Sequence, residues 1–386
     1  MLVQRLILKN WRNFREASIQ FQDITYIVGA NATGKSNLLD VFRFMRDICK
    51  PQGGGLQKAV ESRGGIPKLR CLHARRETEI RIELHLADTV DAKTPAWRYV
   101  LGFKPEGKGS QRILVTDESV WKNGEPEPLL QRPIPDDEAD VARLTQTHLE
   151  QIQSNAEFRP IAEFFADVMY LHVVPQLMKF DGQIGGQRLE NDPFGQGLLE
   201  QVARTADKTR NSRLKRIEQA LAFAIPQFSE LKFVRDAASG RPHLEVRYQH
   251  HRPKAGWQRE DQWSDGTLRL FGLLWSLIGT NSLLLLEEPE LSLNDAIVRE
   301  IPVMLDRLQR NSRRRRQVIL STHSEALLAN KGIDPRAVLR IGTSSEGSEI
   351  LPADDAEIAA VQTGLSVAEV ILPKTRPLKA EQLRLF

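Results

Sequence analysis

The segment Gly29-Ala30-Asn31-Ala32-Thr33-Gly34-Lys35-Ser36 constrains the fold of this chain more than any other. It matches G-x-x-x-x-G-K-[ST] at every fixed position, between an apolar run, Ile24 to Val28, and an amphipathic stretch, Lys35 to Cys49. The glycines let the backbone curl so that successive N–H groups face phosphate oxygens, and the helix start adds partial positive charge. A glycine-containing turn that matches by chance is the alternative. The context favours a strand, a nucleotide-binding loop and a helix.

Within this loop the residue types assign separate roles. Lys35 is expected on the β- and γ-phosphates, and the Ser36 hydroxyl in the shell of a Mg²⁺ ion. Asn37, the next residue, completes the predicted nucleotide contacts.

A second segment, Ser282 to Glu290, joins four leucines to an acidic pair, Glu287 and Glu288. Such an apolar strand is buried in a parallel sheet, and its carboxyl end faces the ligand crevice. We predict that Glu287 holds Mg²⁺ and that Glu288 orients or deprotonates an attacking water. The alternative is an acidic first helical turn before Leu291, stabilised by the helix dipole.

Another apolar run, Gln317 to Ser321, ends in Thr322-His323-Ser324. A lone histidine is more often structural than catalytic. This one closes a strand that we place in the same sheet as the acidic pair, so we predict that His323 contacts a γ-phosphate.

The turn Trp263-Ser264-Asp265-Gly266-Thr267-Leu268-Arg269 opens an apolar helix predicted from Gly266 to Ile278. A serine and a glycine at a helix start form an anion site through N–H groups and the dipole. Because the chain already has a phosphate loop for its nucleotide, a second anion site requires an explanation.

The order of these motifs resembles that of the ABC-type ATPases of the RecF, SMC and OLD-nuclease group. The resemblance covers roughly residues 1 to 180 and 260 to 345. It implies an α/β fold: an ABC-type P-loop ATPase head with a mixed sheet, an antiparallel β element and a helical lobe. It also implies that Ser264 and Gly266 bind the γ-phosphate held by an opposite subunit, so that a head-to-tail homodimer encloses two ATP molecules with Mg²⁺.

The resemblance implies roles for four further segments. Leu291 to Asn294 corresponds to the D-loop and His323 to the switch histidine. Gln176, after a strand predicted to end at Val174, corresponds to the metal-contacting Q-loop glutamine. Arg12, in the turn Asn10-Trp11-Arg12-Asn13-Phe14, resembles a nucleotide-contacting arginine.

The chain departs from the family pattern in several places. Glu287 stands where many relatives have aspartate, which lengthens the reach to the metal by one methylene. The signature reads S-D-G-T rather than S-G-G-Q, a variant associated with stand-alone RecF-like ATPases, many from bacterial defence systems. Nothing between residues 180 and 260 could form an SMC coiled coil. No acidic constellation of a Toprim nuclease is recognised, and Asp354 with Asp355 reads as an exposed acidic turn.

The motifs predict the organisation of the chain. We divide it into an N-terminal part of the ATPase lobe (1–180), a helical insert (181–262), a C-terminal part of the lobe (263–345) and a tail (346–386). Further elements follow from periodicity: antiparallel strands over 77–121, and helices over 136–153, 213–224 and 295–309. The tail after Pro352 has no clear pattern.

Composition adds limits. The chain has 386 residues, is 41% hydrophobic and carries a net charge of +4, so net charge alone does not argue for nucleic-acid binding. The two cysteines, Cys49 and Cys71, lack CxxC spacing, so the sequence predicts neither a disulfide framework nor a zinc site. This favours a reducing compartment, the cytoplasm. The N-terminus has no uninterrupted apolar core of a signal peptide, and the leucine run is too short to span a bilayer. We expect a cytoplasmic protein without a membrane segment.

Two basic segments leave alternatives open. Arg313 to Arg316 could contact DNA phosphates or an acidic partner, or serve as a solvated connector. The segment from Leu372 to Phe386 could dock on a partner, or fray.

The leading hypothesis is an ATP-dependent switch that controls a separate effector, such as a nuclease or another toxic enzyme, in anti-phage defence. A RecF-like DNA-binding repair ATPase is the alternative; a steep loss of duplex binding with rising salt would favour it. An ATPase subunit of a membrane transporter is disfavoured by the antiparallel strands, the long insert and the variant signature.

Overall fold

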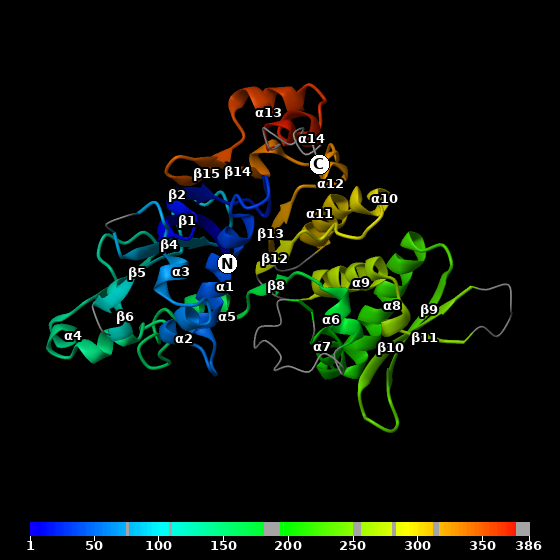
Figure 1. Cartoon of the computed structure of the whole chain (residues 1–386), viewed down its shortest axis with the longest axis horizontal. Helices are drawn as coiled ribbons and strands as arrows, with labels where there is room; N and C mark the ends of the chain where they lie inside the picture. The colour runs from blue at the N-terminus through cyan, green and yellow to red at the C-terminus, as the bar shows by residue number, and fades with distance from the viewer. Residues whose placement is uncertain are drawn as a thin grey trace, which may run out of the picture. The chain divides into compact units, whose positions relative to one another are not determined.

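The computed structural model describes residues 1–74, 77–107, 110–180, 194–195, 197–249, 256–279, 283–311 and 316–375 (Figure 1). The chain divides into two compact units. The first comprises Met1–Met169, Asn281–Leu285 and Gln309–Phe386, and the second Tyr170–Thr280 and Leu286–Leu308. In the described residues, no helix combines the length and the apolar character needed to cross a bilayer.

An antiparallel sheet of six strands forms a large part of the first unit. Its strand order is β2-β1-β4-β5-β6-β7. The strands are β1 (Leu2–Trp11), β2 (Phe14–Gln20), β4 (Ile80–Ala87), β5 (Trp97–Gly107), β6 (Ser110–Lys122) and β7 (Leu130–Arg132). Leu6, Leu84 and Tyr99, which lie side by side on the neighbouring strands β1, β4 and β5, are fully buried, as expected for a sheet with a covered face. The antiparallel strands predicted over 77–121 are confirmed.

Helix α1 (Lys35–Cys49) covers that sheet with its aromatic side chains. Phe44 meets Trp11 edge-to-face and stacks on Phe103, with ring centroids 5.2 and 5.4 Å apart, and Phe42 meets Phe21 in a second edge-to-face pair. The same helix also contacts β3, β13 and helix α5 (Arg159–Ala166). The predicted bounds of α1 are confirmed, because a helix that is buried on several sides carries a strong apolar pattern.

A second, mixed sheet carries the motifs. Its order is β15-β14-β3-β13-β12-β8. The strands are β3 (Ile24–Gly29), β8 (Met169–Leu171), β12 (Leu283–Glu287), β13 (Gln317–Thr322), β14 (Val338–Ser344) and β15 (Gly347–Pro352). β3 pairs in parallel with β13 and β14, with Val28 opposite Thr322. The phosphate loop and His323 therefore follow strands whose carboxyl ends lie at the same edge of the sheet.

The second unit combines helices with a three-stranded antiparallel sheet of order β11-β10-β9. Figure 1 shows β9 beside α8, and the Arg210 guanidinium of α8 lies 4.2 Å from the Phe233 ring centroid of β9. The elements are α6 (Pro175–Lys179), α7 (Leu198–Arg204), α8 (Asp207–Ala224), β9 (Phe228–Arg235), β10 (Pro242–Tyr248), β11 (Gln258–Arg259), η2 (Glu260–Gln262), α9 (Asp265–Ile278) and α10 (Asp295–Val298). A helical lobe with a small strand element is predicted over residues 181–262; α7, α8, β9, β10, β11 and η2 lie in that range, whereas the compact unit itself also takes in α6, α9 and α10.

Two predicted helices are shorter or broken in the structure. The segment 136–153 holds only α4 (Pro135–Ala139) and η1 (Val141–Thr145), because Asp140 accepts a hydrogen bond from Ala142 N and starts the second turn anew. The helix over 295–309 is interrupted between α10 and α11 (Ile301–Asn311), and Pro302, the second residue of α11, has no N–H to continue the hydrogen bonding of a preceding helix.

Elsewhere the structure extends or shortens the prediction. The strand over 168–174 ends at Leu171, and Pro175 begins α6. The tail forms α13 (Asp355–Gln362) and α14 (Val367–Val370), each with a capping box. The remaining elements are α2 (Leu56–Glu61), α3 (Ile66–Leu69), α12 (Glu325–Leu328), η3 (Pro335–Ala337) and η4 (Leu372–Thr375).

Candidate functional site

The phosphate loop has the backbone that its glycines permit. Gly34 adopts φ 108° and Ala32 φ 65°, so the chain turns sharply between β3 and α1. At Gly29 a Cβ atom would lie 2.8 Å from the carbonyl oxygen of Ile341 on β14, closer than real Cβ contacts. Helix α1 then begins without a side-chain cap, which leaves its N-terminal N–H groups directed at the loop.

Lys35 lies against this loop rather than in solvent. Its ammonium donates to the carbonyl oxygens of Gly29 and Ala30 at 2.8 and 3.1 Å, and the residue is 7% exposed. Thr33 donates its hydroxyl to the same Ala30 oxygen at 2.9 Å. A lysine held at the mouth of a curled loop is placed to meet a phosphate with little loss of side-chain entropy.

Three residues of the phosphate-loop motif are exposed: Asn31, Ala32 and Ser36. Asn31 and Ala32 form the outer side of the loop, and Ser36 stands in the first turn of α1. The predicted nucleotide contacts of these residues, and the predicted metal contact of Ser36, stay predictions.

Hydrogen bonds from the turn after β1 and from β15 hold the phosphate loop and the first turn of α1. Trp11 donates its ring N–H to the carbonyl oxygen of Asn37 at 2.9 Å, and the Asn37 amide bonds the Asn13 side chain. From β15, Ser348 donates its hydroxyl to the Thr33 carbonyl at 2.6 Å and its main-chain N–H to Asn13. Sequence reasoning gave no role to Asn13 or Ser348. Ser348 lies 315 positions from Thr33, and no spacing rule links so distant a residue to the loop.

Arg12 is engaged within the protein. Its guanidinium binds the Asp40 carboxylate of α1 at 2.5 Å, and Arg63 binds the same carboxylate at 3.0 Å. Burial alone would raise the pKa of Asp40, but Arg63 and Arg12 hold that pKa below its ordinary value. Arg12 therefore stabilises the position of α1, and its predicted nucleotide contact stays a prediction.

His323 follows β13 directly and is exposed. Its two neighbours are occupied locally, because Ser324 N donates to the Thr322 hydroxyl at 3.0 Å and the Ser324 hydroxyl caps α12. These bonds fix the backbone on both sides of His323. They leave the imidazole outside the strand, at the sheet edge where the phosphate loop also begins.

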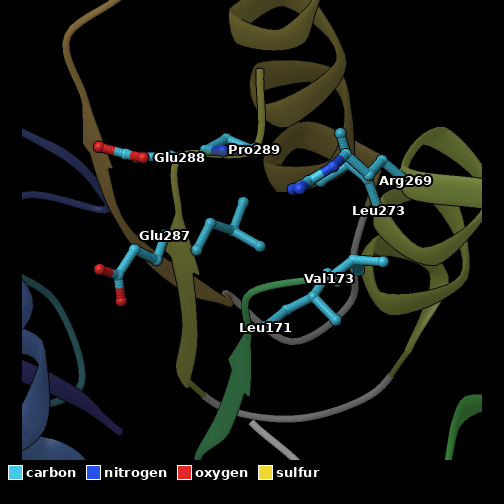
Figure 2. A pocket seen from close by; sticks show the side chains of 8 residues that line it. Leu171, Val173, Arg269, Leu273, Glu287, Glu288 and Pro289 are labelled. Atoms are coloured by element: carbon cyan, nitrogen blue, oxygen red, sulfur yellow. The ribbon is translucent and has the colours of Figure 1, made fainter. Parts of the chain in front are cut away.

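The acidic pair stands at the end of β12 in the second unit. The four leucines before it are fully buried, whereas Glu287 and Glu288 are partly exposed. Glu288 has a left-handed φ of 44°, an uncommon conformation for glutamate. Figure 2 shows both carboxylates on the side away from Leu171, Val173 and Leu273. The left-handed backbone at Glu288 places the carboxylates of Glu287 and Glu288 on the same side, whereas an extended strand would direct two neighbouring side chains to opposite faces.

Behind the pair lies a mostly apolar pocket. Arg269 of α9 extends into it, as Figure 2 shows. Burial lowers the pKa of its guanidinium, and the nearby carboxylates of Asp265 and Glu288 oppose this shift only in part. The pocket is lined by Leu171, Val173, Arg269, Leu273, Leu286, Glu287, Glu288 and Pro289. Sequence reasoning gave Arg269 no separate role; its place in the helix after the signature turn was the available signal.

Neighbouring residues hold Glu287. The Tyr170 hydroxyl of β8 donates to the Glu287 carboxylate, and His172 Nδ1 lies 3.2 Å from the Glu287 main-chain oxygen. Neither residue was singled out from the sequence, because a short strand with one tyrosine carries no chemical signature.

The signature turn is capped by its own serine. The Ser264 hydroxyl accepts from Thr267 N at 3.1 Å and lies 2.8 Å from the Thr267 hydroxyl. A Cβ at Gly266 would lie 2.5 Å from the carbonyl oxygen of Ser292, which itself has φ 61°. Gly266 is therefore required for the approach of the segment 291–294, in addition to any phosphate contact. Asn294 ends that segment as the cap of α10.

Gln176 lies in α6 and bonds the signature turn. Its amide donates to Asp265 at 2.8 Å, and Lys179 donates to the other oxygen of the same carboxylate at 2.7 Å. The Lys179 ammonium holds the pKa of Asp265 below its ordinary value. The amide nitrogen of Gln176 is thus directed at Asp265, and its predicted metal contact would use the other end of the amide.

The residues predicted to bind the metal have side chains of types that suit Mg²⁺. Ser36, Glu287 and Gln176 offer hydroxyl, carboxylate and amide oxygens, which are ligands that Mg²⁺ accepts. The described residues contain no cluster of three histidine, cysteine or acidic side chains that could hold a metal. Mg²⁺ commonly uses one or two protein ligands with substrate phosphates and water, so this donor set fits the ion.

Comparison with known proteins identifies the family. Residues 24–329 match the family described as "AAA domain, putative AbiEii toxin, Type IV TA system". The chain belongs to this family. It is an ABC-type ATPase of the RecF, SMC and OLD-like group, as the motifs predicted. No curated protein matches the sequence.

Solved structures agree on the fold. An SMC head bound to the C-terminal winged-helix domain of ScpA superposes with a TM-score of 0.57 at 16% identity, over 92% of this chain and 99% of that one. An SMC head with an extended coiled coil, bound to the C-terminal domain of ScpA and derived from Pyrococcus furiosus, gives 0.50 at 15% identity, over 94% and 98%. The predicted ABC-type head fold is confirmed.

Proposed function

We propose that this ATPase-family chain binds ATP with Mg²⁺ and hydrolyses it in a site that a second copy completes. The observation that supports this most is the phosphate loop, in which Lys35 is held at the mouth of a glycine turn before an uncapped helix. Backbone N–H groups, the dipole of α1 and one ammonium together suit a triphosphate.

The other motifs divide the remaining chemistry in this proposal. Glu288 accepts a proton from the attacking water as the water oxygen bonds to the γ-phosphorus and the β–γ bridging bond breaks. His323 contacts the γ-phosphate from the end of β13. Ser36, Glu287 and Gln176 would hold Mg²⁺, which when bound would neutralise phosphate charge.

The second copy enters through the signature turn. Ser264 caps its own helix as an acceptor, but a hydroxyl also has a proton to donate. We propose that Ser264 donates to the γ-phosphate held by the phosphate loop of the opposite copy. Two ATP molecules would then be enclosed in a head-to-tail dimer, and this closure would be the state that ATP controls.

We further propose that the dimer regulates a separate effector in anti-phage defence. The family description refers to a toxin of a toxin–antitoxin system, which favours a role in restraining or releasing a harmful activity. Fold likeness to SMC heads does not carry their partners over to this chain.

The test uses Glu288→Gln, which should retain ATP binding, hydrolyse slowly and accumulate as a dimer. Light scattering with ATP and Mg²⁺ measures the mass, and phosphate release measures turnover. Adding Ser264→Arg to this variant should return it to the monomer without loss of ATP binding, because the larger cation blocks closure. A Glu288→Gln protein that stays monomeric with ATP at high concentration would contradict the sandwich.

A further inference from the structure

Strand β8 and the residue that follows it hold Glu287 at two points. The buried Tyr170, 7% exposed, donates its hydroxyl to Oε2 of the carboxylate. Two residues later, His172 Nδ1 meets the Glu287 main-chain oxygen at 3.2 Å. Tyr170, in the strand beside β12, therefore holds the side chain of Glu287, and His172, just after that strand, contacts its backbone.

The length of the side chain explains why such a hold would be useful. Glutamate has one more rotatable bond than aspartate, so more conformational freedom is lost when its carboxylate is fixed. A hydrogen bond from a neutral hydroxyl to a carboxylate is stronger than one between neutral groups. It uses a lone pair of one oxygen and leaves the other oxygen able to accept.

We propose that Tyr170 is a positioning residue that compensates for the extra methylene of Glu287. By holding Oε2 from β8, it keeps Oε1 in one orientation for the Mg²⁺ shell. The inference rests on the proposed function, since it concerns the same metal carboxylate. Groups that orient a metal ligand commonly change metal affinity by about 10- to 100-fold when removed.

A matched pair elsewhere in the chain separates this role from simple packing. Tyr99 is fully buried and donates its hydroxyl to Glu118 at 3.0 Å, within the antiparallel sheet. Tyr99→Phe removes the same kind of bond as Tyr170→Phe, but from a glutamate that has no role in the proposed site.

The experiment measures Mn²⁺ binding, as a stand-in for Mg²⁺, by electron paramagnetic resonance with saturating ATP. All proteins carry Glu288→Gln to slow hydrolysis. Tyr170→Phe should weaken Mn²⁺ binding about tenfold and leave ATP affinity in EDTA unchanged. Tyr99→Phe should alter neither. With Glu287→Asp, whose carboxylate is one methylene shorter, adding Tyr170→Phe should change Mn²⁺ affinity by less than about twofold.

Each other outcome overturns the proposal. Unchanged Mn²⁺ affinity in Tyr170→Phe means that the bond has no part in metal binding, and tighter binding means that Tyr170 competes with the metal. An equal loss with and without the Glu287→Asp substitution means that Tyr170 acts through another group. Absence of Mn²⁺ binding in the parent Glu288→Gln protein would instead remove the proposed function, and this inference with it.

Discussion

Two turns of this chain, the phosphate loop and the signature turn, place serine and glycine at the start of a helix, yet they differ in construction. Helix α1 begins after Gly34 with no side-chain cap, and Lys35 folds over the loop. Helix α9 begins after Ser264, which caps it through Thr267 N. An uncapped, glycine-shaped start favours an external anion, whereas a self-capped start is already satisfied.

From this difference we infer which turn would bind phosphate in a single chain. The phosphate loop offers N–H groups and an ammonium together. The signature turn offers an acidic neighbour, Asp265, that is held by Gln176 and Lys179. We infer that the signature turn gains phosphate affinity only when a nucleotide already bound to another copy is presented to it.

The largest effect should come from the phosphate loop. Lys35→Ala removes a charged donor to the phosphates, so ATP affinity should fall about 10- to 100-fold, from the loss of about 1.5–3 kcal/mol. Titration calorimetry with the isolated protein measures this. Lys179→Ala, the matched lysine at the signature turn, should leave affinity for ATP within about twofold. Equal losses in the two variants would erase the distinction between the turns.

A smaller effect should come from Gly266. A methyl group there would lie 2.5 Å from the Ser292 carbonyl oxygen, so α9 or the segment 291–294 must shift. We expect Gly266→Ala to lower the free energy of unfolding by about 1–3 kcal/mol in chemical denaturation. Gly342→Ala is the control, because no atom lies within 4 Å of its added Cβ. If Gly266→Ala left the free energy of unfolding unchanged, the close approach to Ser292 would not be the reason for this glycine, and phosphate binding would be its only proposed role.

The sequence predicted the elements whose pattern is local. The bounds of α1, and the succession of strand, loop and helix around the phosphate loop, follow from periodicity and from the motif spacing. The site residues proposed from the motifs all lie at strand ends, in the turns that follow them or at helix starts, including Gln176, the second residue of α6. Such positions are readable because the backbone geometry requires particular residue types there.

The contacts that hold those residues could not be predicted. Three such contacts join segments remote in sequence: Tyr170 with Glu287, Ser348 with Thr33, and Arg12 with Asp40. Tyrosine, serine and aspartate serve many roles in proteins, so their residue types alone do not reveal these contacts. The tail helices were missed for a different reason. Their caps, Asp354 with Glu357 and Ser366 with Glu369, were legible, but an acidic pair was interpreted as an exposed turn.

The smallest effect should be the acid sensitivity of the signature turn. Lys179 lowers the pKa of Asp265 in the folded protein, so the stability that this contact contributes is present above the ordinary aspartate pKa and is lost as pH falls through the folded value. Asp265→Asn should therefore lower the unfolding free energy at about pH 5, and its difference from the parent protein should be smaller near pH 3. Chemical denaturation at both pH values measures the gap. In a Lys179→Met background most of the gap should already be absent at the higher pH. Helix α1 has no acidic residue in its first turn, so the phosphate loop lacks a corresponding contact. A gap that persists unchanged at the lower pH would show that Asp265 acts without its charge, and the two turns would then differ in shape alone.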